Sequence, residues 1–156
     1  MKKTPTPLIQ YVLIVSRYFP KNEYFNGKQT DFVTKIKMGT KEHTLRDNYK
    51  LWAKRFEKID KGLAYLSLRF WENEPYRSKQ IEFRKLFKTD GISIEKITFN
   101  KDWLVDDKDI LLDEKKLARN DGLSLSDFNE WFKKDIGTGN EKAIIRFTPN
   151  RYELPF

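Results

Sequence analysis

The segment AYLSLRF at residues 64–70 is followed by the turn-forming ENEP at 72–75 and by QIEFRKLF at 80–87. Both outer segments alternate apolar residues with small or polar ones, a pattern typical of β-strands with one buried face. Two such strands joined across a turn predict an antiparallel hairpin. The hairpin argues against a doubly wound parallel sheet, in which each strand is followed by a helix.

The region before this hairpin combines a strand with two helices. Residues 11–15 (YVLIV) are apolar on both faces and predict a buried central strand. Residues 18–28 contain several chain breakers and predict a loop. A short amphipathic helix is predicted to end at Gly39, and Asp47 or Asn48 is expected to cap a second, basic helix.

The region after the hairpin supplies further strands and two short helices. Alternation predicts a strand at 92–97, and an apolar run predicts a closing strand at 143–147. Short helices are predicted at 114–119 and from Ser124, a residue that suits a helix N-terminus. The acidic stretch at 102–114 lacks the glycine and spacing of a calcium loop, so it predicts a solvated insertion rather than a metal site.

These elements predict an α+β fold built as a small, partly closed, mostly antiparallel β-barrel with flanking helices. The chain contains no internal repeat, no low-complexity tract and no linker that would divide it. We therefore expect a single domain covering residues 1–156, which is long enough to bury a real core.

The composition of the chain is basic and rich in aromatic residues. The net charge is +8, the isoelectric point is about 9.5, and aromatic residues make up 15% of the chain. This charge favours a polyanionic partner: nucleic acid, a nucleotide or, with weaker support, an anionic membrane surface. The chain has no cysteine and one histidine, which excludes thiolate and multi-histidine metal centres, and we expect no cofactor.

The apolar run near the N-terminus does not predict a membrane segment. Residues 8–15 are far fewer than the roughly 20 that a membrane-spanning helix needs. Two prolines lie between the initial lysines and this run, and no small-residue cleavage site follows it. We therefore expect a cytoplasmic protein without membrane association.

The stretch GTKEHTLR at residues 39–46 places a lysine, a threonine, an arginine and the only histidine where a predicted helix gives way to a predicted strand. Strand alternation puts Thr44 and Arg46 on one face and His43 on the other. Lys41, in the preceding turn, is near enough to fold back toward Thr44. Two cations beside a hydroxyl suit an anion or a polarised carbonyl. The alternative is a polar strand edge with two solvated cations.

Three short motifs of the chain resemble the signature of the ASCH domain, a relative of the PUA domain. The first is KxxTxR at 41–46, which follows a predicted helix. The second is KG at 61–62, just before the strand predicted at 64–69, and the third is DGLSL at 121–125. The motifs occur in the family's order, and the resemblance spans residues 30–148.

The resemblance implies a PUA-like barrel with a basic cleft suited to RNA or to a modified nucleoside or nucleotide. One small bacterial member of the family is an amidohydrolase that removes the acetyl group from acetylated cytidine with a lysine, a threonine and a glutamate. The matching residues are Lys41 as base, Thr44 as nucleophile and Asp121 as acid or orienting group. Asp121 is one methylene shorter than the family's glutamate, and Leu63 stands where an acidic residue is common.

We expect the chain to bind RNA or a nucleotide in this cleft, with the amidohydrolase as the alternative. The expected ligand-binding residues are Arg46, Arg69, Trp71 and Arg77, and the expected contacts to a nucleic-acid backbone are Lys50, Lys54, Lys58 and Lys79. Structural roles are the competing interpretation: Lys41 as a solvated turn residue, Arg46 in an ion pair with an aspartate, and Asp121 as a turn-shaping residue. His43 is expected to pack away from Thr44 and to have no catalytic role.

Overall fold

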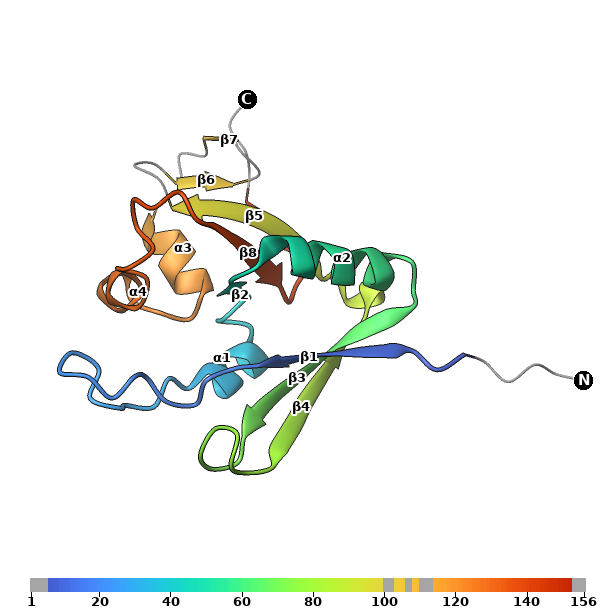
Figure 1. The fold of residues 1–156 in the computed structure, drawn as a ribbon, viewed down its shortest axis with the longest axis horizontal. Coiled ribbons are helices and arrows are strands. Elements are labelled where there is room, and N and C mark those ends of the chain that lie inside the picture. Colours follow the sequence, from blue (N-terminus) through green and yellow to red (C-terminus); the bar gives the residue numbers. More distant parts are fainter. Residues whose placement is uncertain (1–5, 100–102, 106–107, 110–113, 153–156) are drawn as a thin grey trace, which may run out of the picture.

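The computed structural model describes residues 6–99, 103–105, 108–109 and 114–152. Strands and helices are mixed along the chain, and the strands form two separate sheets (Figure 1). The predicted α+β class is therefore confirmed. Part of the acidic stretch at 102–114 lies outside the described residues. In the described part of the chain, no helix is long and apolar enough to cross a bilayer.

The first sheet has three strands in the order β1-β3-β4. They are β1 (Ile9–Ile14), β3 (Ala64–Trp71) and β4 (Gln80–Leu86). β3 and β4 form the predicted antiparallel hairpin, with a register shift between Leu68 and Arg69. β1 runs parallel to β3 on its other side, so the strand that opens the predicted hairpin is the centre of this sheet.

The prediction of a central strand at 11–15 is wrong, because β1 is an edge strand of the described sheet and pairs only with β3. Its apolar character has another cause. Leu13 and Val15 are buried in the core, whereas Val12 and Ile14 on the alternate face are half-buried. An edge strand whose two faces are both covered by other parts of the protein is also apolar on both faces, like a central strand.

The second sheet has five strands in the order β2-β8-β5-β6-β7, all of them antiparallel to their neighbours. They are β2 (His43–Arg46), β8 (Glu141–Arg146), β5 (Ser93–Phe99), β6 (Trp103–Val105) and β7 (Lys108–Asp109). The predicted closing strand is β8, and it lies between β2 and β5. β2, which carries the threonine and arginine of the first motif, therefore sits at one edge of this sheet.

The predicted partly closed barrel does not form: the described strands make two open sheets that share no ladder. One hydrogen bond links the two sheets directly: Arg46 Nη2 at the end of β2 donates to the carbonyl oxygen of Ile14 in β1 at 2.6 Å. β2 is only four residues long and leads almost directly into a helix. It therefore offers little extended backbone for pairing with β1.

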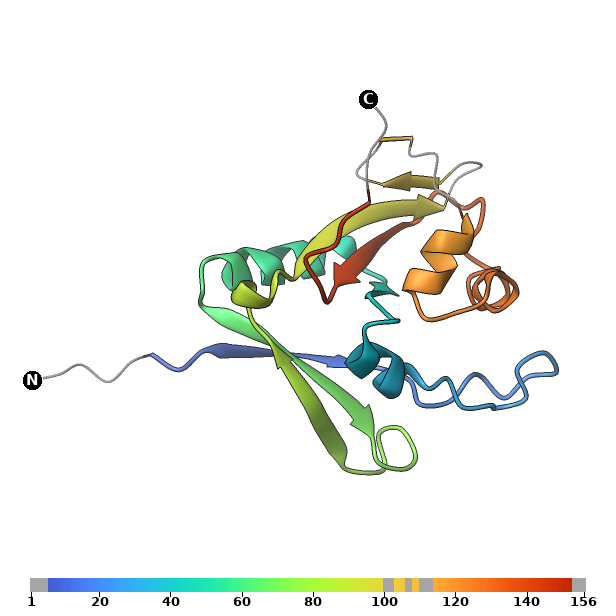
Figure 2. The same ribbon diagram turned by 180° about the vertical axis from the view of Figure 1, so that it is seen from behind.

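The helices are α1 (Phe32–Met38), α2 (Tyr49–Asp60), α3 (Glu114–Asn120) and α4 (Leu125–Trp131), with a 3₁₀ turn η1 at Lys88–Asp90. Gly39 ends α1 at φ 82°, and Asn48 Oδ1 accepts from Leu51 N to cap α2. Ser124 caps α4 by accepting from Asp127 N. α2 contacts β3 in one sheet and β5 and β8 in the other, and Figures 1 and 2 show it between the two sheets.

The loop after β1 is fixed by aromatic packing. Phe19 and Phe25 stack with their ring centroids 4.5 Å apart, and Trp131 at the end of α4 meets both rings edge-on. Phe32 of α1 completes this aromatic cluster. The predicted loop is thus held against two helices, and it forms one wall of the cleft described below.

Candidate functional site

The lysine and the carboxylate of two separate sequence motifs meet in the interior. Lys41 lies between α1 and β2 and is 2% exposed, and Asp121, in the turn after α3, is 3% exposed. Lys41 Nζ donates to the carbonyl oxygen of Asp121 at 2.5 Å and lies 3.3 Å from its Oδ1. The same ammonium lies 4.2 Å from the centre of the Phe32 ring. Lys41 is therefore not the solvated turn residue of the competing interpretation.

Gly122 makes this contact sterically possible. Its φ is 81°, and a Cβ at this position would lie 3.2 Å from three carbons of the Lys41 side chain. A larger residue would be strained in its backbone and would press on the lysine stem. The two residues of the DG pair in the third motif therefore act together, because the aspartate binds the ammonium and the glycine leaves room for the side chain that carries it.

His43 belongs to the same polar cluster, which the sequence reasoning missed. Its Nδ1 lies 3.3 Å from Asp121 Oδ1, and its Nε2 lies 2.6 Å from the hydroxyl of Tyr152. Asn120 Nδ2 also donates to the Tyr152 hydroxyl, at 3.3 Å. The prediction that His43 faces away from Thr44 agrees with the strand register, in which His43 pairs with Arg146 and Thr44 with Ile145. The sequence did hold one signal for this: His43 is two residues after Lys41, and residues two apart in an extended chain lie on the same face.

Burial sets the protonation of this cluster. It lowers the pKa of Lys41 to about 8 against the attraction of Asp121, and the positive charge of Arg46 lowers it further. Burial also lowers the pKa of His43, although its hydrogen bond to Asp121 opposes this. Burial raises the pKa of Tyr152 to about 12. At neutral pH the cluster therefore holds a charged lysine, a neutral histidine and a neutral tyrosine.

Thr44 does not join the lysine and the carboxylate. It is 7% exposed, and its hydroxyl makes no hydrogen bond to Lys41 or Asp121 among the described residues. It shares a strand face with Arg46, which points toward the first sheet. The structure thus brings together two of the three residues expected to be catalytic and leaves the nucleophile candidate apart from them.

Arg46 lines a hollow with a volume of about 740 Å³. The walls come from the end of β1 and its following loop, from Arg46 of β2, and from the end of β3 with the turn that follows it. The charged side chains of the lining are Arg17, Lys21, Arg46 and Glu74, and its large rings are Tyr18, Phe19, Trp71 and Tyr76. We call this hollow the Arg46 cleft.

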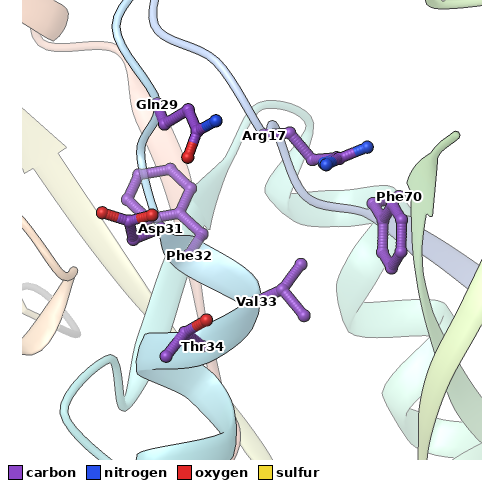
Figure 3. Close-up of a pocket in the computed structure, with 7 residues that line it drawn as sticks. All are labelled: Arg17, Gln29, Asp31, Phe32, Val33, Thr34 and Phe70. Carbon is purple, nitrogen blue, oxygen red and sulfur yellow. The ribbon is translucent and has the colours of Figure 1, made fainter. Parts of the chain in front are cut away.

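A smaller hollow of about 240 Å³ lies beside the Arg46 cleft, and Arg17 lines both. Figure 3 shows Arg17 and Phe70 on one side of it and Val33 and Thr34 of α1 on the other. The guanidinium carbon of Arg17 lies 5.2 Å from the centre of the Phe70 ring, and its Nη1 donates to the carbonyl oxygen of Glu72 at 2.9 Å. Arg17 therefore ties the loop after β1 to the base of the β3–β4 turn.

The other predicted binding residues are spread over the surface. Arg69 donates to Ser67 Oγ and Gln80 Oε1 within the first sheet and does not line the Arg46 cleft. Arg77 and Lys79 are exposed next to the cleft-lining turn. The three lysines of α2, Lys50, Lys54 and Lys58, are exposed and lie outside the cleft lining. Of the four residues expected to bind the ligand, Arg46 and Trp71 therefore share one cleft.

A second buried ion pair was not anticipated from the sequence. Arg146 of β8 is 1% exposed, its Nε donates to Glu95 Oε1 of β5 at 2.5 Å, and its guanidinium carbon lies 4.0 Å from the centre of the Tyr152 ring. The two ion-paired residues are 51 positions apart, and nothing in the sequence of either strand marks them as partners. Only strand pairing brings them together.

The described residues contain no group of three or more histidine, cysteine, aspartate or glutamate side chains arranged to hold a metal ion. The described features that bear on function are the Arg46 cleft, with basic, aromatic and apolar side chains and one carboxylate, and the buried Lys41–Asp121 pair. Comparison of the chain with protein-family models, with curated proteins and with solved structures finds no significant match.

Proposed function

We propose that this protein is a cytoplasmic RNA- or nucleotide-binding domain of the ASCH, PUA-like type, and that the Arg46 cleft is its ligand site. The observation that carries the proposal is the convergence of Arg46, Trp71 and the cations Arg17 and Lys21 on one hollow of about 740 Å³. That volume is within the range of small-molecule and cofactor sites. The net charge of +8 supports an anionic ligand.

Three kinds of side chain in the cleft match parts of a nucleotide. The indole of Trp71 offers a face on which a base stacks. Arg46 offers only donors, which suit a carbonyl oxygen or an anionic oxygen. Arg17 and Lys21 supply positive charge for phosphate, and the lysines of α2 extend the basic surface for a longer strand.

The proposal is tested by binding of a fluorescein-labelled 12-nucleotide single-stranded RNA, followed by anisotropy. With about four phosphate contacts, raising the salt from 50 to 200 mM is expected to weaken binding roughly 50-fold, because cation release scales with the number of contacts. Lys21→Gln should reduce the salt slope by about 0.7, whereas Lys133→Gln, at an exposed lysine paired with Glu130 outside the cleft lining, should leave it unchanged. Absence of binding, or binding indifferent to salt, would contradict the proposal.

A second candidate is an amidohydrolase acting on an acylated nucleoside such as acetylated cytidine. The observation in its favour is Lys41, whose Nζ lies 3.3 Å from the Asp121 carboxylate and whose pKa is lowered to about 8. A lysine with that pKa is neutral in roughly a tenth of molecules at pH 7 and is then able to take the proton of Thr44. This candidate ranks second because the Thr44 hydroxyl makes no hydrogen bond to either residue.

The amidohydrolase is tested by incubating the purified protein with acetylated cytidine and measuring released acetate. Thr44 as nucleophile predicts that Thr44→Ala abolishes turnover and that Thr44→Ser retains part of it, since serine keeps the hydroxyl. Equal acetate release by the wild type and by Thr44→Ala would remove Thr44 from this role, and no release by the wild type would remove the candidate.

A further inference from the structure

Tyr76 is the most exposed large hydrophobic residue in the described part of the chain. It stands in the turn after β3 with 88% of its surface exposed. Its backbone has φ 64°, in the left-handed region that bulky side chains rarely adopt. A strained backbone that holds an aromatic ring in solvent is a feature typical of functional turns.

The Tyr76 ring packs against another aromatic ring in the lining of the Arg46 cleft. Its centroid lies 5.3 Å from that of Trp71, with the ring planes tilted by 50°, and both residues line the cleft. The tilt leaves the faces of the two rings only partly covered by one another. A planar ring placed between them requires a separation of about 7 Å, twice a contact distance of about 3.5 Å. An outward movement of the exposed tyrosine by about 2 Å therefore opens a slot.

We propose that Trp71 and Tyr76 form a ring-binding slot that takes one unpaired nucleobase, with Tyr76 moving outward to admit it. The inference rests on the proposed function and adds a second stacking residue and a ligand class, since the slot accepts a base that is not already stacked in a duplex. Arg17, which donates to the carbonyl of Glu72, holds the base of the turn in place while the ring moves. The base comes either from a single-stranded nucleic acid or from a free nucleotide.

The slot is tested with Tyr76→Gly, which removes the ring and suits the left-handed backbone, and with Tyr76→Phe, which keeps the ring. Loss of one stacked base predicts a Kd about tenfold higher for a labelled 12-nucleotide U strand in Tyr76→Gly and a change within about twofold in Tyr76→Phe. A matched 12-base-pair duplex should bind both variants and the wild type equally. Tyr24→Ala is the control, because Tyr24 is 45% exposed and does not line the cleft.

Competition with uridine monophosphate distinguishes the two sources of the base. If the nucleotide displaces the labelled strand at a similar molar concentration, the ligand is a free nucleotide. If only unlabelled strand displaces it, the ligand is a nucleic acid. Both outcomes support the slot if Tyr76→Gly weakens the binding. Wild-type binding that Tyr76→Gly leaves unchanged would overturn the slot while leaving the proposed function intact. A wild type that binds neither strand nor nucleotide would overturn the proposed function and the slot with it.

Discussion

Replacement of Asp121 by alanine is expected to lower the free energy of unfolding by about 3–5 kcal/mol at pH 7, because it leaves a buried ammonium without its counter-charge. Lys41 is 2% exposed, and in the variant its only remaining protein acceptor among the described residues is the carbonyl oxygen of residue 121. His43 also loses its partner at Nδ1. Urea denaturation followed by circular dichroism measures the change.

Three further variants assign this loss to the ion pair. Asp60→Ala removes an exposed carboxylate at the end of α2 and should change stability by less than about 0.5 kcal/mol. Lys41→Met should also be destabilising, since it leaves the Asp121 carboxylate, which is 3% exposed, with the His43 ring as its side-chain partner. The double variant should then cost less than the sum of the two single changes. A loss below about 1 kcal/mol in Asp121→Ala would show that the pair is not stabilising.

The stability of the wild type is expected to rise by about 2 kcal/mol between pH 7 and pH 10 through Lys41 alone. Burial lowers the folded-state pKa of this lysine to about 8, whereas in the unfolded chain it titrates near 10.5. Between these values the unfolded state binds more protons than the folded state, so unfolding becomes less favourable as the pH rises. Well below pH 8 the full cost of the buried charge is present.

The measurement is the midpoint of urea unfolding at half-unit pH intervals from 7 to 10, compared between the wild type and Lys41→Met. The rise should vanish in Lys41→Met, which has no group titrating at this position. The range ends at pH 10 because Tyr152, whose pKa is raised to about 12, lowers stability above its unfolded value. Identical slopes in the two proteins would show that Lys41 titrates as an exposed lysine.

The parts of the fold that were predicted correctly depend on neighbours close in sequence. The β3–β4 hairpin follows from alternation across a short turn, and the end of α1 and the start of α4 follow from Gly39 and Ser124. The predicted basic helix is α2, in which Trp52, Phe56 and Ile59 are buried and the lysines are exposed. These choices are made by hydrogen bonds and packing within one turn of helix or one hairpin.

The parts that were not predicted depend on contacts between distant segments. The position of β1 at a sheet edge is decided by its parallel pairing with β3, more than fifty residues away. The buried pair of Arg146 and Glu95 arises only from the register of β8 against β5. No local pattern encodes such pairings, because the sequence separation between the partners is set by the topology.

The stretch at residues 39–46 shows how the two kinds of information divide. The amino-acid sequence by itself determined which residues stand there, that a helix ends at Gly39, and that Thr44 and Arg46 share a strand face opposite His43. The tertiary structure decided their partners: the turn after α3 brings Asp121 to Lys41 and His43, and the edge of β1 draws Arg46 to the cleft. The physical reason is that a buried charge needs a counter-charge or a hydrogen-bond partner. The packing of the whole fold decides which of these groups lies near it.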